Sequence, residues 1–504
     1  MMHKGKDEVI GIVTIEPEPP STAFCWVQLK GVDVIKKGAF IVIKDAKRSI
    51  TFVGQVLDVT NQITILGSPS REEMLKKNAV AEDLIKDSLS RPDFLKSLAK
   101  VKLMYKIVDN NISTVDTPPV DTSQVIVTTM DLPRVLGFSV DPSKSICLGS
   151  LYAQPDVPVC LDLNRMLGGH IAIFGQTWSG KSHAAGVIIE EVVNRGVPVV
   201  VFDHMGEYES MSMTVDGGKG LNVIKLVPGS NITIDFDDIM KVPQILTSIG
   251  ITDAQLNLLR DAYTTAQSNG LHGLNAIRWL LNDVQISTRQ GSRVVKRLYI
   301  IGRGRGYSVA TIDGLRWKLE SLLNLGIIGG GYDIRNIVKP GHLTVIDLST
   351  IDQQSAILTV ASILGKIIES RKINVIPPLL VVIEEAHNYV TIEETPSSVL
   401  IRNMVRGARH FGVGVALITQ RPSGIHRDAL NVVNTHIIFR LKGTDLEYVR
   451  QFAPLTNEEI NDIQLLPDGV AYITGPIIRG GHAIKVRIRE RHTVHGGRSI
   501  PFIP

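Results

Sequence analysis

The spacing of apolar residues changes along the chain and predicts segments of different structure. Residues 8–59 contain short alternating runs, VIGIVTI, FCWVQLK, AFIVIKD and ITFVGQVLDV, with turn residues between them. Short, evenly spaced strands of this kind predict a small β-barrel. Residues 70–100 are charged and helix-favouring, and residues 103–127 return to strand-like sequence. We therefore expect an N-terminal β-barrel domain over residues 1–150, with a helical insertion at about residues 70–100.

Strand-like and helix-like segments alternate in the rest of the chain. An apolar strand ends at residue 174, a helix covers residues 183–194, and a second strand covers residues 199–203. The alternation resumes between residues 343 and 439, which predicts an α/β fold with a parallel sheet covered by helices on both faces. Residues 239–324 read as helices with few strand signals. We expect a core formed by residues 151–238 and 331–475, interrupted by a helical subdomain over residues 239–330.

A glycine-rich motif, Gly175-x-x-x-x-Gly180-Lys181-Ser182, joins the first of these strands to its helix. In such a P-loop the backbone N–H groups wrap around a phosphate, the lysine reaches the β- and γ-phosphates, and the hydroxyl ligates Mg²⁺. The helix that follows places its N-terminus at the phosphate. The sequence therefore predicts an ATP and Mg²⁺ site formed by nine consecutive residues: Gly175, Gln176, Thr177, Trp178, Ser179, Gly180, Lys181, Ser182 and His183.

Two adjacent acids, Glu384 and Glu385, end the apolar strand LLVVI. Hydrolysis at a P-loop needs one carboxylate for Mg²⁺ and a second to orient the attacking water. We assign Glu384 to Mg²⁺, together with Ser182, and Glu385 to the water. The alternative is a plain solvated strand end.

Gln420 follows another apolar strand, VGVALIT over residues 413–419, at the position expected for a γ-phosphate sensor. Its amide both donates and accepts hydrogen bonds, so it can link the γ-phosphate to the water. The alternative is a strand-to-turn junction stopped by Pro422. The preceding helix carries Arg402, Arg406 and Arg409. Either they form a solvated basic face, or one of them is an arginine finger that reaches the γ-phosphate of a neighbouring subunit.

Three further segments are ambiguous. Residues 203–208, DHMGEY, place two acids near the phosphate end of the sheet and either sense Mg²⁺ or form a turn. Residues 302–307, GRGRGY, form a flexible cationic loop that could touch nucleic acid. Residues 484–491, IKVRIRER, alternate cations with apolar residues, as a half-buried edge strand kept soluble by charge would do.

Composition narrows the class of protein. The chain has 504 residues and a net charge of +4, which permits a nucleic-acid partner only through a local basic patch. Cys25, Cys147 and Cys160 lack metal-ligand spacing and cannot all pair, so we expect three buried small residues in a reducing compartment. The N-terminus lacks the apolar stretch of a signal peptide, and no uncharged run of about 18 apolar residues occurs. We expect a cytoplasmic, nucleoid-associated protein without a membrane partner.

Taken in order, these motifs resemble those of the archaeal HerA family. The resemblance covers nearly the whole chain and includes LDLNRMLGGHIAIFGQTWSGKS, VVVFDHMGEY, LLVVIEEAHNYV, RGARHFGVGVALITQRPS and the closing RIRERHTVHGG. It implies a RecA-like P-loop ATPase core and an N-terminal barrel similar to that of ATP synthase subunits (HAS-barrel-like). The sequence departs from the family in two places. Trp178 stands where Gly is usual, and residues 203–208 read Asp-His-Met-Gly-Glu-Tyr where the family has Asp-Pro-His-Gly-Glu-Tyr.

The resemblance also implies a function. HerA proteins are hexameric DNA translocases, so it implies a homo-hexamer whose bore encloses double-stranded DNA and whose ATP sites lie between subunits. It favours Arg409 as the trans-acting finger, with Arg406 second, and a C-terminal tail over residues 476–504 that braces a neighbouring subunit. It further implies a NurA-type nuclease partner, association with other double-strand-break repair nucleases, and DNA end resection for recombinational repair. The alternatives are a motor that moves protein through a secretion channel and a non-catalytic, nucleotide-dependent scaffold.

Overall fold

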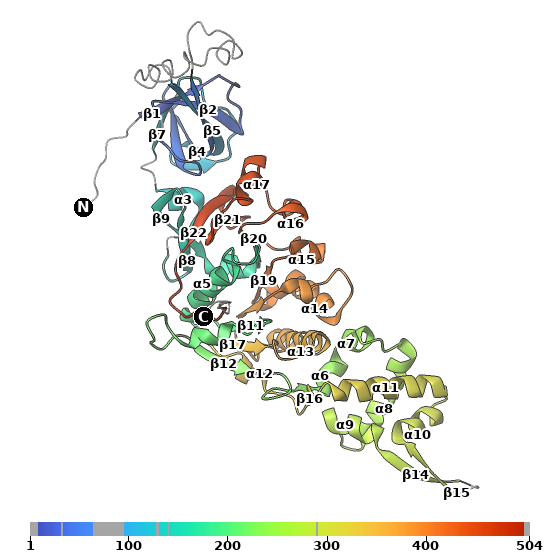
Figure 1. The fold of residues 1–504 in the computed structure, drawn as a ribbon. Helices are drawn as coiled ribbons and strands as arrows, with labels where there is room; N and C mark the ends of the chain where they lie inside the picture. The colour runs from blue at the N-terminus through green and yellow to red at the C-terminus, as the bar shows by residue number, and fades with distance from the viewer. Residues whose placement is uncertain are drawn as a thin grey trace, which may run out of the picture. The chain divides into compact units, whose positions relative to one another are not determined.

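The computed structural model describes residues 9–31, 34–63, 95–127, 131–139, 141–288 and 291–497. The chain folds into two compact units. The first contains Met1–Asp162, Ile438–Lys442 and Ala453–Arg489, and the second contains Leu163–Ile437, Gly443–Phe452 and Glu490–Pro504. Figure 1 shows their elements, coloured along the chain.

The first unit begins with the predicted β-barrel. Its strands follow the order β2-β1-β7-β3-β4-β5-β6, and pairing of β2 with β5 closes the sheet. Alternate side chains, among them Val13, Val27 and Phe52, are fully buried in the barrel core. The strands are β1 (Val9–Thr14), β2 (Phe24–Leu29), β3 (Phe40–Asp45), β4 (Ile50–Ile63), β5 (Leu95–Val108), β6 (Asn111–Ser113) and β7 (Gln124–Val127).

The predicted helical insertion is wrong at its C-terminal end. Residues 95–100 form the first part of β5, which pairs with β4 over Leu95 to Ala99 and beyond. The remainder of that prediction, residues 70–94, lies outside the residues that the structure describes. Ala99, Val101 and Leu103 alternate with Lys100 and Lys102, and the strand buries these three apolar residues in the barrel core.

A short antiparallel sheet completes the first unit, in the order β21-β22-β8-β9. Its strands are β8 (Ser145–Leu151), β9 (Gln154–Asp162), β21 (Val470–Thr474) and β22 (Ile484–Ile488). Residues 484–491 were predicted to form an edge strand, but β22 pairs with both β21 and β8, so it is internal. Its cations are accommodated locally: Lys485 lies 2.8 Å from Asp462, and the Arg487 guanidinium lies over the Tyr152 ring.

Cys147 and Cys160 correct the cysteine prediction. They face each other across β8 and β9 and form a disulfide, whereas Cys25 is buried in the barrel as expected. The spacing of the cysteines contained no signal for this pair, because it depends on the register of a hairpin.

The second unit contains the predicted parallel sheet, in the order β12-β17-β11-β18-β19-β10-β20. The pairings from β12 to β10 are all parallel, and β10, β11, β18 and β19 are buried throughout. This confirms the α/β prediction and explains the continuous apolar runs, since both faces are covered. The strands are β10 (Ile171–Phe174), β11 (Val199–Asp203), β12 (Asn222–Leu226), β17 (His342–Asp347), β18 (Leu379–Ile383), β19 (Val413–Thr419) and β20 (Thr435–Ile438), with helices α5 (Lys181–Asn194), α13 (Gln353–Lys372) and α14 (Pro396–Gly407).

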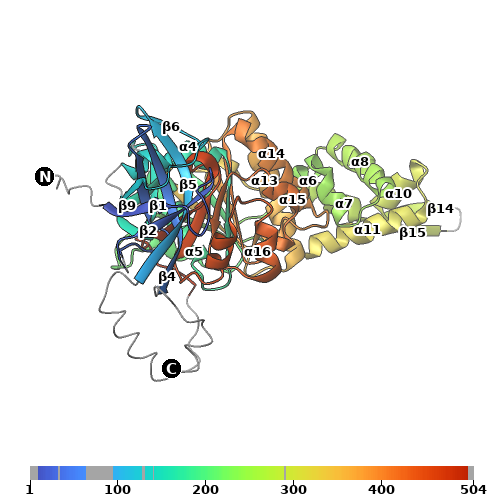
Figure 2. The same cartoon turned by 90° about the horizontal axis from the view of Figure 1, so that it is seen from above.

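The predicted helical insertion is also present in this unit. Figures 1 and 2 show its helices grouped together beyond α13, with a hairpin of β14 (Asp283–Thr288) and β15 (Gly291–Lys296) at the end farthest from the sheet. The helices are α6 (Phe236–Lys241), α7 (Pro243–Ser248), α8 (Asp253–Ser268), α9 (Gly273–Leu281), α10 (Arg297–Gly304) and α11 (Val309–Asn324). They share a core that includes Phe236, Leu258 and Leu315. Among the helices in the described ranges, none is both long enough and apolar enough to cross a membrane.

The cationic segment GRGRGY is not the flexible loop that was predicted. Its first three residues end α10, and a Cβ at Gly302 would lie 2.7 Å from Ile312 Cγ1. Tyr307 donates a hydrogen bond of 3.0 Å to Asp261. Gly302 therefore serves helix packing.

Candidate nucleotide-binding site

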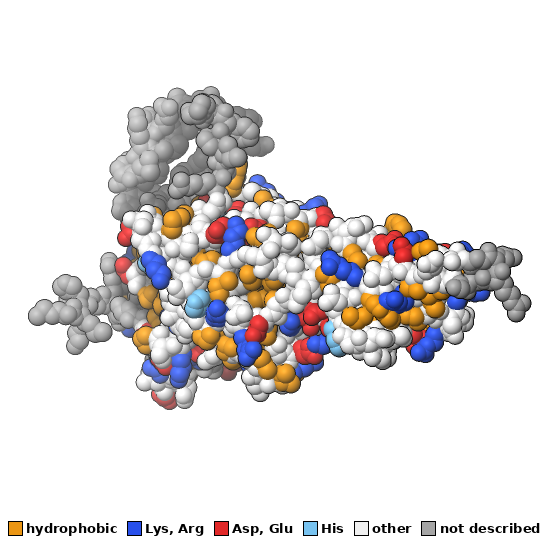
Figure 3. Space-filling model, turned by 90° about the horizontal axis from the view of Figure 1, so that it is seen from below, with side chains coloured by type: hydrophobic (Ala, Val, Ile, Leu, Met, Phe, Trp, Pro, Cys, Tyr) orange, Lys and Arg blue, Asp and Glu red, His pale blue; other side chains and the backbone are white. Residues whose placement is uncertain are grey.

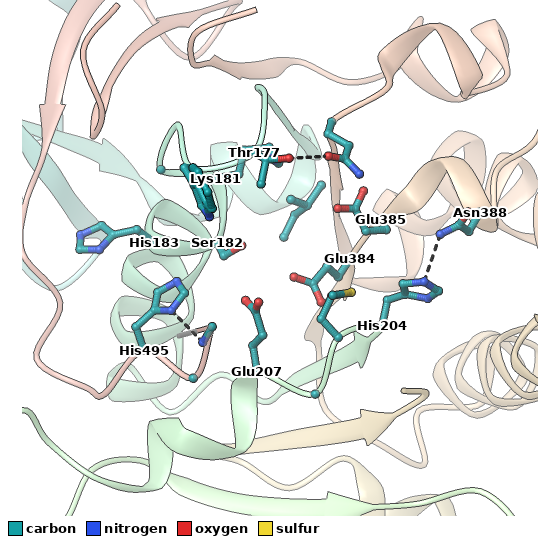
Figure 4. A pocket seen from close by; sticks show the side chains of 18 of the residues that line it. Thr177, Lys181, Ser182, His183, His204, Glu207, Glu384, Glu385, Asn388 and His495 are labelled. Atoms are coloured by element: carbon teal, nitrogen blue, oxygen red, sulfur yellow. Dashed lines mark hydrogen bonds between the residues drawn. The ribbon is translucent and has the colours of Figure 1, made fainter. Parts of the chain in front are cut away.

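Four neighbouring strands of the parallel sheet, β10, β19, β18 and β11, end at a cavity of about 890 Å³. Figure 4 shows side chains from several segments pointing into it. A cavity of this size holds a small organic ligand. The lining residues come from the P-loop and the start of α5, the loop after β11, the ends of β18 and β19, and the C-terminal segment 495–497.

The P-loop runs from the end of β10 to the start of α5 at Lys181. Gly180 has a φ of 113°, a left-handed conformation that glycine adopts readily. The Lys181 ammonium donates to the Gln176 carbonyl at 2.9 Å, and Ser179 Oγ donates to the same oxygen at 2.7 Å. Burial lowers the pKa of Lys181, while the carboxylates of Glu385, Glu384 and Glu207 oppose that shift. Lys181 is thus held at the cavity beside a group of acids.

Trp178 is the unusual P-loop residue. Its φ of 63° is left-handed, which costs an L-residue other than glycine about 1–2 kcal/mol. Its side chain is 77% exposed, although it lines the cavity. The indole therefore lies at the cavity mouth without a packing partner that would compensate the backbone cost.

Glu384 is a buried carboxyl group with one unpartnered oxygen. It is 3% exposed, and its Oε2 has no hydrogen-bond partner among the described residues. Burial raises the pKa of Glu384 well above its ordinary value, and the nearby carboxylates of Asp203 and Glu207 raise it further. A buried anion of this kind fits a cation, because cation binding offsets the cost of desolvating the charge. Ser182, on the first turn of α5, lines the same cavity, so the two predicted Mg²⁺ ligands are brought together.

Glu385 follows in a left-handed conformation, with a φ of 44°. Its Oε2 lies 3.3 Å from His387 Nδ1, and that nitrogen lies 2.9 Å from Thr419 Oγ1. Burial lowers the pKa of His387, against the opposing effect of the Glu385 carboxylate. Glu385 is therefore directed into the cavity, with a neutral imidazole behind it.

Gln420 lies between the P-loop and the acids. The acid-bearing strand β18 is separated from β10 by β19, and Gln420 follows β19 directly. Thr177 Oγ1 donates a hydrogen bond of 2.9 Å to Gln420 Oε1. The sequence did not predict this link.

The loop after β11 contains both a turn and a cavity residue. Asp203 accepts hydrogen bonds from the backbone N–H groups of Met205, Gly206 and Tyr208, so it shapes the turn. Glu207 lines the cavity instead, and burial together with the Asp203 carboxylate raises its pKa. The turn is thus confirmed at Asp203, and a role of this segment in sensing Mg²⁺ stays a prediction.

Sequence reasoning missed several lining residues. His204 Nδ1 lies 2.8 Å from the Tyr389 hydroxyl, and Asn388 Nδ2 lies 3.4 Å from His204 Nε2. His387 and Asn388 lie within three residues of Glu385, so their closeness to the acids in the sequence could have predicted them. His495, Gly496 and Gly497 also line the cavity. Their signal was only a pair of glycines after a histidine.

The arginines lie elsewhere. Arg406 donates to Asp428 at 2.6 Å, and Arg402 donates to Glu394 at 3.0 Å. Arg409 belongs to the short 3-10 helix η4 (Ala408–Phe411), and its side chain is outside the part that the structure describes. Within the described part of the chain, the cavity lining contains no arginine.

Comparisons with known proteins agree with this arrangement. The family model described as "Helicase HerA, central domain" matches residues 146–367. The chain is 26% identical to the DNA double-strand break repair helicase HerA of Pyrococcus furiosus, over 94% of this chain and 91% of that protein. It is 27% identical to the protein of the same name from Sulfurisphaera tokodaii, over 86% of each. The structure of the plasmid coupling protein TrwB with a GTP analogue shares the fold, with a TM-score of 0.51, 16% identity, and coverage of 74% of this chain and 95% of that one.

Proposed function

Because the chain belongs to the HerA-type family, we propose that it is an ATP-hydrolysing, ring-forming helicase that moves along double-stranded DNA. One observation carries the catalytic part of the proposal. The P-loop, the paired acids Glu384 and Glu385, and Gln420 converge on one cavity although they lie far apart in the sequence. A protein that only bound nucleotide would not need a carboxylate to orient water.

Each residue has a defined role in this proposal. Lys181 and the P-loop N–H groups bind the phosphates, and Ser182 and Glu384 hold Mg²⁺. Bound Mg²⁺ would supply positive charge to the phosphate oxygens. Glu385 polarises the attacking water, and Gln420 contacts the γ-phosphate. His387 lies beside Glu385, with its Nδ1 3.3 Å from that carboxylate.

A site shared between subunits would supply the arginine that the cavity lining, among the described residues, does not contain. Charge developing on the γ-phosphate is commonly stabilised by an arginine finger. We assign Arg409, with Arg406 second, to the site of the next subunit in a homo-hexameric ring. The C-terminal tail, residues 476–504, is proposed to brace that neighbour.

DNA would be gripped through its phosphates in the ring bore. On the face shown in Figure 3, basic side chains are interspersed with acidic ones and form no single broad patch over the described residues. Binding through the phosphates is independent of sequence but steeply dependent on salt, because each neutralised phosphate releases counterions.

The test combines affinity and ATPase activity. Affinity for several unrelated duplexes is measured across a salt series, and hydrolysis is measured with and without duplex DNA. A preference above about tenfold for one sequence, or a log-log salt slope near zero, would contradict the proposal. ATPase activity that DNA does not stimulate would favour a motor for another cargo, such as protein.

We further propose a nuclease partner of the NurA type, with other double-strand-break repair nucleases, for DNA end resection in the cytoplasm. The relatives' names, which include double-strand break repair, support this role. The barrel is the proposed docking surface, because the surfaces of the parallel-sheet unit are committed to ATP and DNA. Removing residues 9–127 should abolish co-elution with the nuclease and retain ATPase activity. Retained co-elution would show that the nuclease docks on a surface outside the barrel.

A further inference from the structure

The C-terminal segment 491–497 is anchored to α5, the helix that directly follows the P-loop. Glu190 on α5 is 1% exposed. Its Oε1 accepts hydrogen bonds from His492 N at 2.9 Å, Thr493 N at 2.8 Å and Thr493 Oγ1 at 2.7 Å. A buried carboxylate that accepts several hydrogen bonds from one segment fixes its position firmly. The segment is therefore attached to the same element that binds the phosphates.

Arg491 strengthens this attachment. Its guanidinium lies so close to α5 that a Cβ at Gly186 would be 2.5 Å from Arg491 Cζ, so a side chain at Gly186 would displace the guanidinium. Arg491 Nη2 donates to Thr493 Oγ1 at 3.1 Å and to the Val494 carbonyl at 3.0 Å. Val494 N donates in turn to the Met213 carbonyl at 2.9 Å. These contacts leave the segment little freedom where it reaches the cavity.

The next three residues, His495, Gly496 and Gly497, line that cavity. A Cβ at Gly496 would lie 2.2 Å from the Glu207 carbonyl oxygen, and one at Gly497 would lie 2.5 Å from Glu207 Oε1. Gly496 therefore requires glycine, because a side chain would collide with the Glu207 backbone, whereas a side chain at Gly497 would displace the Glu207 carboxylate. The two glycines let the backbone form part of the cavity wall and hold His495 beside it.

The position of the phosphates sets the direction of a bound nucleotide. Figure 4 shows Glu385 and Glu384 on one side of Ser182, and His183 and His495 on the other. The γ-phosphate belongs on the side of Glu385, where the attacking water must be. A nucleotide with its phosphates on the P-loop would therefore extend its sugar and base toward His183 and His495.

We propose that His495, with the backbone of Gly496 and Gly497, binds the nucleoside part of ATP. This inference rests on the proposed ATPase function and adds a binding residue that the P-loop motif does not contain. Gly497 N donates to His495 Nδ1 at 3.0 Å, so the ring carries its proton on Nε2. Burial, together with the charges of Arg491 and His183, lowers the pKa of His495, which favours the neutral ring. A neutral imidazole can stack on a base and donate a hydrogen bond from Nε2.

The experiment compares two ligands that differ only at the nucleoside. Binding of Mg-ATP and of Mg-tripolyphosphate to the full chain is measured by calorimetry. His495→Ala should weaken Mg-ATP binding by about tenfold, the effect of losing one stacked or hydrogen-bonded contact, and leave tripolyphosphate binding unchanged. His495→Asn should show the same selective loss of Mg-ATP binding. Its side-chain oxygen can still accept the hydrogen bond from Gly497 N, so the local backbone is preserved. If His495→Ala fails to fold, His495→Asn decides the question.

A matched control lies in the same segment. His492 is exposed and does not line the cavity, so His492→Ala should bind both ligands as the unmodified chain does. Lys181→Ala should lose both ligands, because it removes a phosphate contact. Unchanged Mg-ATP affinity in the His495 variants, or an equal loss of both ligands, would overturn the proposal. Failure of the translocase proposal would appear separately, as ATP binding and hydrolysis that DNA does not affect.

Discussion

Thr177 Oγ1 donates a hydrogen bond of 2.9 Å to Gln420 Oε1, which ties the P-loop to the end of β19. Because β19 lies between β10 and β18, this bond joins the phosphate-binding loop to the strand next to the acids. A γ-phosphate at the cavity would accept a hydrogen bond from the Gln420 amide nitrogen, while Oε1 still accepts from Thr177. The Thr177–Gln420 pair is thus placed to couple the P-loop to the presence of the γ-phosphate.

Replacing Thr177 with Val tests this coupling, because valine keeps the branched shape and removes the hydroxyl. Loss of one hydrogen bond of about 0.5–1.5 kcal/mol should lower kcat by roughly three- to tenfold and leave KM for ATP nearly unchanged. Steady-state ATPase assays measure both constants. Thr177→Ser keeps the hydroxyl and is the control. Equal kcat for Thr177→Val and the unmodified chain would remove the pair from catalysis.

Glu385→Gln should leave ATP bound but almost unhydrolysed. The amide fills the same space as the carboxylate but cannot polarise water, so kcat should fall by about a hundredfold or more. Equilibrium binding and single-turnover hydrolysis separate the two effects. Lys181→Ala is the contrasting variant and should weaken binding itself. Turnover near that of the unmodified chain would exclude Glu385 as the group that activates water.

Local patterns predicted the elements of the sheet well. The strand at residues 413–419 was predicted with the bounds that β19 has, because an uninterrupted apolar run ends at a polar residue followed by Pro422. The motif residues at the cavity were also readable, since parallel strands bring their carboxyl ends to one edge of a sheet. The Thr177–Gln420 bond was not, because it depends on β19 lying between the other two strands.

Contacts between distant segments account for what the sequence did not predict. The contacts of Glu190 with His492 and Thr493 join residues about 300 positions apart, and no periodicity encodes them. The β14–β15 hairpin was missed because its short alternating runs lie within a mostly helical segment. The strand at residues 95–100 was misassigned because charge favours helix locally, whereas pairing with β4 decided the outcome.

Mixing two inactive variants tests the assignment of Arg409. Arg409→Ala subunits and Glu385→Gln subunits should each bind ATP without hydrolysing it. Mixed rings should recover part of the activity, because some interfaces then pair an intact Glu385 with an intact Arg409. ATPase activity across a range of mixing ratios is the measurement. No recovery despite demonstrated subunit exchange would remove support for action in trans and make Arg406 the next candidate.

His436 predicts a dependence of stability on pH. It is 3% exposed on β20, it stacks on Phe174 with ring centroids 6.1 Å apart, and neither ring nitrogen has a hydrogen-bond partner among the described residues. Burial lowers the pKa of His436 to about 4 from 6.5. Between these values the unfolded chain binds the proton and the folded chain does not, so stability falls as pH decreases.

His436→Phe should therefore stabilise the protein, and by more in acid. Phenylalanine keeps a ring for stacking and removes two buried polar atoms without partners, which is worth about 1–3 kcal/mol. The gain should grow by about 2 kcal/mol between pH 7 and pH 5, because the unmodified chain loses stability there and the variant does not. Denaturant unfolding at both pH values measures it, with His492→Phe at an exposed position as the control for the substitution. A stability difference that is the same at both pH values would show that folding does not shift the pKa of His436.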